Sequence, residues 1–340
     1  MPRARAFLLF ILLLGSAVPT RSADDGKTNG RRVLIKQSAT LFVTDPEGTT
    51  RSKIADNVWA AALSPDGNLV AYADRKTVNV FSLPENKAVT LAQITEGHVH
   101  SLAWSPDQKH LAYDVEVRMK SWSIYLASYP PSGNAPRDLG HWYETISFSP
   151  NGKFIVHPSF NETDHDILEA VNVETVKRET IFKGATTIWQ AKYSPDGSSI
   201  AFMMTDPKDD ASERDFGGSQ RDLWVLPLAS RKAVKIMSGV FDFDWSPDGK
   251  FLAIGTGSVE GAYPPGDGAV FISSADGKVQ FQLSKHAPSM DAKFSPDSKK
   301  VMFVDFYPPH FVIGDLATRK LTPMPAPASE GDALTVYDWK

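Results

Sequence analysis

Apolar and polar positions follow a short cycle that recurs along the chain. In "WAAALSPDGNLVAYAD" (residues 59–74), an apolar run ends at a turn of small and polar residues, and a second apolar run follows. Apolar residues stand next to one another in these runs, which is typical of strands covered on both faces. Near-copies of the cycle are "HSLAWSPDQKHLAYD", "TISFSPNGKFIVH", "WQAKYSPDGSSIAF", "FDFDWSPDGKFLAI" and "MDAKFSPDSKKVMF".

Each cycle continues with two further apolar runs, for example "TVNVFSL" and "AVTLAQI" after the first copy. The repeat unit therefore contains four predicted strands. In the turn between the first two, proline presets the φ angle of a type I turn and Asp or Asn follows it. A glycine usually comes next and tolerates the left-handed conformation of a bulged hairpin. The prolines are Pro65, Pro106, Pro150, Pro195, Pro247 and Pro296.

The spacing of the repeats predicts the architecture. The serines that open the turns stand at positions 64, 105, 149, 194, 246 and 295, so successive repeats are 41, 44, 45, 52 and 49 residues apart. Four-stranded units with a period of about 40–50 residues are typical of β-propeller blades.

The two ends of the chain supply the pieces of one more blade. The C-terminal "VYDW" resembles "DFDW" at 242–245, but no turn follows it. Near the N-terminus, "NGRRVLIK" and "TLFVTDPEG" read like the second and third strands of a repeat. We therefore predict an all-β, seven-bladed propeller over residues 28–340. In one blade, the C-terminal strand is innermost and joins the N-terminal strands.

The unit of Trp or Phe, Ser-Pro-Asp-Gly and an Ile/Leu-Ala-Phe/Tyr run resembles the TolB-type WD-like propeller repeat of exported bacterial proteins. The resemblance covers nearly the whole predicted propeller, and it implies the fold rather than a function. TolB proteins carry an N-terminal α/β domain, which we expect to be absent here because fewer than ten residues separate the predicted leader from the first strand. For that reason the Tol–Pal partners are not carried over. Prolyl oligopeptidase relatives carry a peptidase domain after the propeller, and we do not expect one here.

The first residues predict an exported protein. Residues 1–23 combine Arg3 and Arg5 with the apolar run "AFLLFILLLGSAV", which is a signal-peptide pattern with cleavage near Ala17 or near Ser22–Ala23. The expected location is periplasmic or secreted, and no later apolar run predicts a transmembrane segment. Loss of the leader changes the net charge from −4 to about −7, which gives no support for nucleic-acid binding. The chain has no cysteine, and hence neither a disulfide nor a thiol for a lipid anchor. Separately, we expect the protein to be a monomer.

Chain direction divides the candidate chemistry between two faces. The Ser-Pro-Asp turns mark a turn face, which we expect to be closed and structural. The opposite loop face carries the connections into each innermost strand and those between the second and third strands, including "TEGHVHS", "LGHWYE" and "SKHAPSMD". Loops on a rigid scaffold are where binding residues concentrate. The predicted ligand-binding residues at this channel mouth are His98, His100, His141, Trp142, Glu144, Trp189 and His286.

Other polar residues have a less specific placement. Chain direction also puts His157, His165 and His310 on the loop face and His110 on the turn face. Four aspartates recur around the innermost strands, and repetition across blades favours a channel-lining or blade-bracing role over paired acid–base catalysis. They are Asp242, Asp244, Asp291 and Asp338.

Two classes of function fit these features. The favoured class is an extracytoplasmic scaffold that holds a protein, peptide or glycan on the loop face, with no cofactor. The alternative is a propeller enzyme, such as a lactonase-like hydrolase or an oligouronate lyase. The lyase needs several histidines to converge on one divalent metal, since seven-bladed relatives of this repeat include oligogalacturonate lyases with a histidine-held metal. No serine nucleophile elbow, phosphate loop or calcium loop is present in the sequence.

Overall fold

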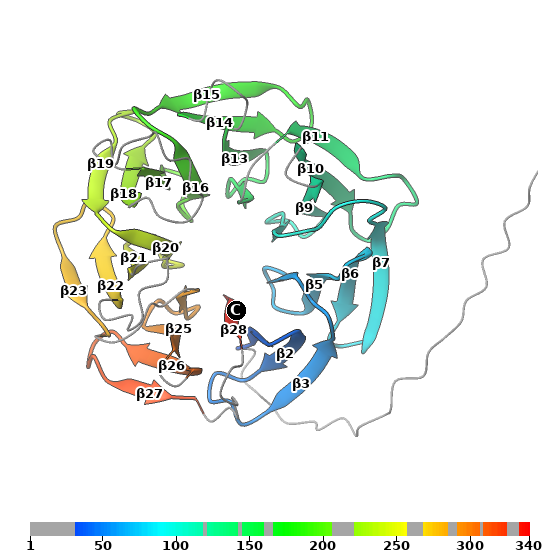
Figure 1. Ribbon diagram of the computed structural model, residues 1–340, viewed down its shortest axis with the longest axis horizontal. Helices are drawn as coiled ribbons and strands as arrows, with labels where there is room; N and C mark the ends of the chain where they lie inside the picture. Colours follow the sequence, from blue (N-terminus) through cyan, green and yellow to red (C-terminus); the bar gives the residue numbers. More distant parts are fainter. Residues whose placement is uncertain are drawn as a thin grey trace, which may run out of the picture.

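The computed structural model describes residues 31–117, 121–141, 145–159, 166–205, 221–256, 268–284, 291–306, 309–324 and 333–340. Within these residues, seven four-stranded antiparallel sheets are arranged in a ring about a central axis (Figure 1). This confirms the predicted all-β, seven-bladed propeller. The predicted leader, residues 1–23, lies outside the described residues. No helix in the described part of the chain has the length and apolar character needed to cross a membrane.

We number the blades from the N-terminus and give the strands of each from the inside outward. Blade 1 contains β28 (Leu334–Trp339), β1 (Val33–Gln37), β2 (Thr40–Thr44) and β3 (Arg51–Ala55). Blade 2 contains β4 (Ala60–Leu63), β5 (Leu69–Ala73), β6 (Thr77–Ser82) and β7 (Lys87–Gln93). Blade 3 contains β8 (Leu102–Trp104), β9 (His110–Val117), β10 (Ser121–Ser128) and β11 (Arg137–His141). Blade 4 contains β12 (Ser147–Phe148), β13 (Phe154–Pro158), β14 (Ile167–Asn172) and β15 (Arg178–Lys183).

The remaining three blades follow the same order. Blade 5 contains β16 (Ile188–Tyr193), β17 (Ser199–Thr205), β18 (Arg221–Pro227) and β19 (Val234–Met237). Blade 6 contains β20 (Val240–Trp245), β21 (Phe251–Thr256), β22 (Ala269–Ser274) and β23 (Gln280–Gln282). Blade 7 contains β24 (Lys293–Phe294), β25 (Lys300–Phe306), β26 (Pro309–Asp315) and β27 (Leu321–Pro323).

A side-chain hydrogen-bond pattern explains why the turn sequence recurs. The Ser246 hydroxyl donates to Asp248 Oδ1 (2.7 Å) and accepts the backbone N–H of Phe251 (2.9 Å). Gly249 takes a φ of 71°, in the left-handed region that glycine adopts without strain. The buried serine thus fixes a turn that leads one strand straight into the next. The same pair of bonds is made at Ser64, Ser105, Ser149, Ser194 and Ser295.

The C-terminal strand closes the ring. Strand β28 pairs antiparallel with β1, so that Trp339 lies opposite Val33 (Figure 1). Beyond the pair, the backbones of Arg32 and Lys340 exchange two hydrogen bonds of 2.6 and 2.8 Å. Residues of β28 and β1 share a buried cluster with Met302 and Phe311 of blade 7. Blade 1 is therefore assembled from both ends of the chain, as the sequence predicted.

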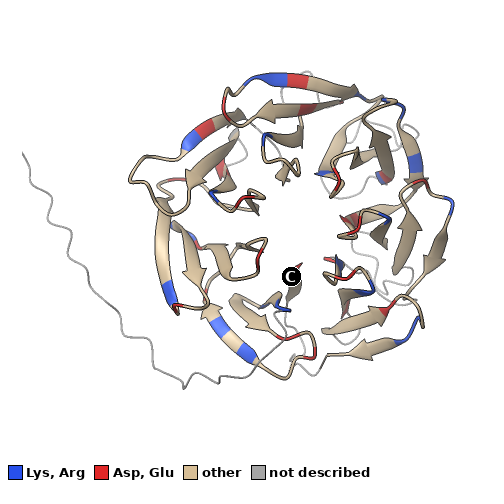
Figure 2. Cartoon of the chain, turned by 180° about the vertical axis from the view of Figure 1, so that it is seen from behind, with Lys and Arg blue, Asp and Glu red and all other residues tan. Residues whose placement is uncertain are grey.

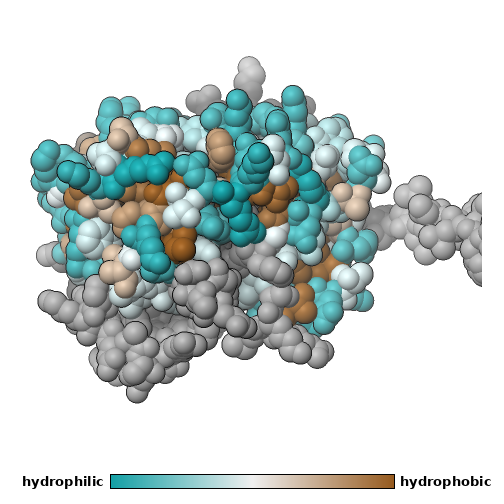
Figure 3. Space-filling model, turned by 90° about the horizontal axis from the view of Figure 1, so that it is seen from above, coloured by the Kyte–Doolittle hydropathy of each residue, from teal (hydrophilic) through white to brown (hydrophobic). Residues whose placement is uncertain are grey.

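Buried side chains between neighbouring sheets hold the blades together. The indole N–H of Trp245 donates to the carbonyl of Lys192 in blade 5 (3.2 Å). Trp104 makes the equivalent bond to Ala62 (3.4 Å). The outer edge of the ring around β15 shows hydrophilic side chains interspersed with apolar ones (Figure 3). The buried apolar clusters join residues of neighbouring blades, as Val33 of blade 1 and Met302 of blade 7 show.

Candidate functional site

An aromatic pair stands on the loop face between blades 2 and 3. Trp59 directly precedes β4 and remains 40% exposed, although tryptophan usually loses more of its surface on folding. Its ring stacks on that of His98, with centroids 5.0 Å apart and planes 10° from parallel. The Arg75 guanidinium lies 5.8 Å from the Trp59 ring centroid. The Tyr337 hydroxyl donates to the Trp59 carbonyl (2.9 Å) and anchors the backbone there.

His100 belongs to a neighbouring polar group. Its Nε2 lies 2.9 Å from Glu116 Oε2, and its ring centroid lies 5.1 Å from that of Trp122. The backbones of His98 and Glu116 exchange hydrogen bonds of 2.9 and 2.8 Å, so Glu116 links the two histidine segments. A side chain at Gly97 would bring its Cβ within 2.2 Å of the Glu116 carbonyl, which explains the glycine. The two histidines diverge to different partners within one connected unit.

A buried carboxylate, Asp114, holds the backbone of the segment that carries His100. Asp114 is 3% exposed and accepts the backbone N–H groups of His100 (2.8 Å) and Ser101 (2.7 Å). Burial raises the pKa of Asp114 to about 6, and the two backbone hydrogen bonds act in the opposite direction. Asp114 is a positioning residue that sequence reasoning missed, because nothing in the spacing marks it.

Of the other predicted mouth residues, Trp189 is the one whose side chain is described. Trp189 lies in β16 of blade 5, where its indole donates to Thr205 Oγ1 (2.8 Å) and the Arg221 guanidinium covers its ring at 4.1 Å. His141 ends β11, and its side chain is not described. Trp142, Glu144 and His286 lie outside the described residues.

One loop-face histidine is buried. His157 lies at the loop-face end of β13, as chain direction predicts, but it has no exposed surface. Its Nδ1 lies 2.7 Å from the Pro158 carbonyl and its Nε2 lies 3.6 Å from Glu169 Oε2. Burial lowers the pKa of His157 to about 3, the Pro158 contact opposes that change, and Arg178 adds to it. His157 is thus a neutral core residue rather than part of the channel mouth, and His165 lies outside the described residues.

Charged residues line the channel wall contributed by blades 5, 6 and 7. Asp242 accepts Gln190 Nε2 at 3.1 Å and the backbone N–H of Asp291 at 3.2 Å. Burial, and then the nearby Asp242 charge, raise the pKa of Asp291 to about 7, while lysines in the channel lower it. Lys192 Nζ donates to the Phe243 carbonyl (2.6 Å) and to Asp244 Oδ1 (3.2 Å). These contacts join neighbouring blades, as the channel-lining interpretation of the aspartates expects.

The turn-face end of the channel is hollow. A cavity of about 550 Å³ is lined by residues from all seven blades, including Pro65, Pro195 and Pro247 of the turns. Figure 2 shows acidic and basic residues gathered on the turns around it. The expectation that the turn face is closed is therefore wrong at its centre, because Ala61, Ala62 and Ala103 project too little to fill it. These alanine residues were the feature of the sequence that could have predicted the cavity.

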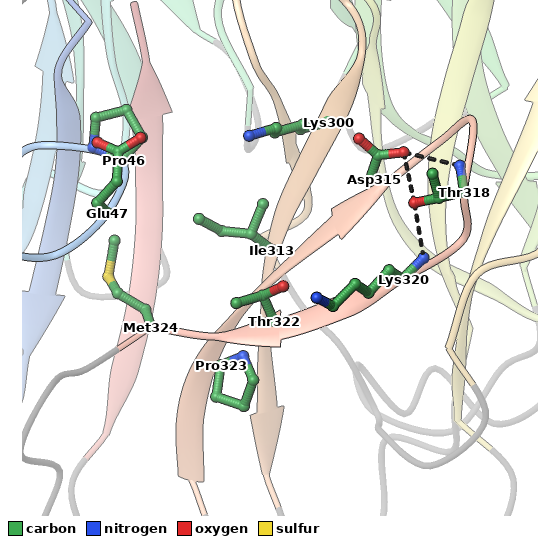
Figure 4. Close-up of a pocket in the computed structure, with 10 residues that line it drawn as sticks. All are labelled: Pro46, Glu47, Lys300, Ile313, Asp315, Thr318, Lys320, Thr322, Pro323 and Met324. Atoms are coloured by element: carbon green, nitrogen blue, oxygen red, sulfur yellow. Dashed lines mark hydrogen bonds between the residues drawn. The ribbon is translucent and has the colours of Figure 1, made fainter.

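A second hollow lies on the outer side of the ring, between blade 7 and blade 1. It has a volume of about 330 Å³, and Figure 4 shows Lys300 and Lys320 on one side of it and Glu47 on the other. Asp315 at its upper edge is held by the backbone N–H and hydroxyl of Thr318, each at 2.8 Å. This groove marks the place where the ring closes.

Within the described residues, no three His, Asp or Glu side chains come together in a way that could hold a metal ion. The predicted metal-binding alternative involves His100, His141, Glu144 and His286. Of these, only the His100 side chain is described, and its Nε2 lies 2.9 Å from Glu116 Oε2. The geometry that the structure does present is therefore a stacking and hydrogen-bonding surface at the mouth, together with a charged channel wall.

Comparisons with known proteins find a WD-repeat match and one distantly related peptidase. The model for the WD domain, G-beta repeat, matches residues 89–112. Dipeptidyl-peptidase 5 of Porphyromonas gingivalis is 26% identical over 259 residues, which are 70% of this chain and 35% of that protein. The chain thus spans about a third of the length of this curated relative.

Solved structures give the same picture. TolB from Acinetobacter baumannii is 16% identical, with a TM-score of 0.54, over 89% of this chain and 81% of that one. An oligogalacturonate lyase in complex with manganese is 11% identical, with a TM-score of 0.64, over 82% of each chain. The tricorn protease is 12% identical, with a TM-score of 0.61, over 92% of this chain and 36% of that one. At these identities the similarity shows the fold: this chain is a β-propeller with TolB-like structural neighbours.

Proposed function

We propose that this protein is an exported β-propeller binding module that holds a protein, peptide or glycan at the channel mouth on its loop face. The stacked pair of Trp59 and His98 carries this proposal. Trp59 is the one aromatic residue among the large apolar side chains that are exposed in the described part of the chain. A sugar ring or an aromatic peptide side chain gains free energy by stacking on such a surface.

The surroundings of the pair suit a polar ligand with a ring. Stacking on His98 and the Tyr337 hydrogen bond restrain Trp59 before a ligand arrives, so little conformational entropy remains to be lost on binding. The Arg75 guanidinium lies beside the ring, and the ion pair of His100 and Glu116 belongs to the segment that carries His98. The signal-peptide pattern of residues 1–23 supports a periplasmic or secreted location. The mass of the exported protein would test that location by showing whether the leader has been removed.

The test compares three probes in isothermal titration calorimetry: trigalacturonate, chitotriose and an unstructured Trp-containing peptide. At least one should bind saturably, and Trp59→Ala should weaken that binding about tenfold, equivalent to about 1.4 kcal/mol. Val89→Ala removes an exposed apolar side chain from an outer strand and should leave the affinity unchanged. Equal affinity in the Trp59→Ala variant would contradict the proposal.

The enzyme alternative rests on the fold shared with the oligogalacturonate lyase. The same titration distinguishes it, because a lyase would cleave trigalacturonate to an unsaturated product. Cleavage that stops with a chelator and returns with a divalent metal would replace the binding module by a metal-dependent lyase.

A further inference from the structure

The turn-face cavity has the size and position of a second ligand site. Its volume of about 550 Å³ lies within the range of about 300–1,000 Å³ that is usual for small-molecule pockets. All seven blades contribute to its lining, so the ring itself fixes its shape. Its lining includes the turn prolines Pro65, Pro195 and Pro247 but neither Trp59 nor His98.

One wall of the cavity is apolar and made of short side chains. Ala61 and Ala62 come from β4, Leu102 and Ala103 come from β8, and Ile146 precedes β12. Ala61, Ala62 and Leu102 retain only 8–9% of their surface. This wall can contact an apolar group but offers no side-chain hydrogen bond.

The opposite wall carries both acidic and basic side chains, and some of their polar atoms have no hydrogen bond within the described part of the chain. Lys293 Nζ lies 3.9 Å from Asp244 Oδ1, which is too far for a hydrogen bond, and it makes none to any described residue. Asp338 Oδ1 accepts the Trp339 N–H at 2.9 Å and lies 3.2 Å from Lys340 Nζ. Asp338 Oδ2 has no hydrogen bond within the described part of the chain. The wall thus presents ammonium donors and a free carboxylate oxygen to the cavity.

The Lys293 ammonium is charged despite its surroundings. Burial by itself would lower the pKa of Lys293, but the carboxylates of Asp244, Asp242, Asp291 and Asp338 raise it above its usual range. The Lys293 side chain keeps 17% of its surface, and its ammonium group faces the cavity without a hydrogen bond to the described residues. A ligand carboxylate would add a charge-assisted hydrogen bond there.

We propose that this cavity binds a small zwitterion with an apolar side chain, such as an apolar amino acid or dipeptide. The ligand carboxylate pairs with Lys293, its ammonium group pairs with Asp338, and its apolar side chain lies against Ala62 and Ala103. A simple anion would meet Asp244 and Asp338, and a simple cation would meet Lys293 and Lys340. A ligand that carries one positive and one negative charge can pair with the groups of both signs on this wall.

Calorimetry with the dipeptide Leu-Leu tests this inference on the full mature chain. Leu-Leu should bind saturably, and N-acetyl-Leu-Leu and Leu-Leu-amide, which each lack one charge, should bind at least tenfold more weakly. Lys293→Met should weaken Leu-Leu binding at least tenfold. Lys278→Met removes a lysine from an exposed turn and should have no effect.

A second variant separates binding from folding, since Lys293→Met leaves several carboxylates without their cation. Ala103→Leu narrows the apolar wall without changing any charge, and it should also weaken Leu-Leu binding while the protein stays folded by circular dichroism. The inference is overturned if Leu-Leu does not bind, if the three probes bind alike, or if folded Ala103→Leu protein binds Leu-Leu as the parent does.

Discussion

Deletion of residues 333–340 would remove the strand that closes the ring. Leu334, Val336 and Trp339 point into the core at 5%, 1% and 3% exposure. Burial of each such side chain contributes about 1.5–3 kcal/mol, so the three together account for about 5–9 kcal/mol. The whole stability of a folded domain is typically about 5–15 kcal/mol. The deletion also leaves the inner edge of β1 without its hydrogen-bonding partner.

The truncated chain should therefore unfold or aggregate at room temperature, as judged by circular dichroism, thermal melting and size-exclusion chromatography. A milder variant gives a graded version of the test. Leu334→Ala should cost about 2–5 kcal/mol, whereas the neighbouring Thr335→Ala, on the less buried side of the strand, should stay within about 0.5 kcal/mol of the parent. A truncated protein that melts within a few degrees of the parent would refute the closure argument.

Two further predictions concern stability. Ser246→Ala should lower the free energy of unfolding in urea by about 1–3 kcal/mol, because the Phe251 N–H loses its buried acceptor, while Ser230→Ala in an exposed turn should change it little. His157 has a folded-state pKa of about 3, below its value of 6.5 in the unfolded chain, so the unfolded state binds more protons between these pH values. Stability should fall as the pH drops from about 6.5 towards 3, and His157→Gln should flatten that dependence; an unchanged slope in the variant would contradict the assignment.

The fold was predictable because its signals are local. Each Ser-Pro-Asp turn is fixed by hydrogen bonds between residues two and five positions apart, for example Ser246 with Asp248 and Phe251. The closing blade was predictable because "VYDW" repeats the pattern of an innermost strand.

The site was less predictable because its contacts are distant in sequence. Chain direction placed His98 and His100 on the loop face, but their partners Trp59 and Glu116 are supplied by strand ends whose side-chain directions the sequence does not show. The channel pair of Lys192 and Asp244 joins residues of different blades, so no spacing within one repeat reveals it. His157 is buried beside Pro158 and Glu169, and its position in the sequence does not show that burial.

The pairing of β28 with β1 also sets an order for folding. The turn hairpins of blades 2–7 can form as soon as their own residues are present, but β1 finds its inner partner about 300 positions later in the chain. Until then Val33, Leu34 and Ile35 present an apolar strand with an unpaired edge, a feature that favours association between chains. Ring closure is a contact of very long range and is expected to be slow. The most aggregation-sensitive period of this protein is thus the interval between the emergence of its first strand and that of its last.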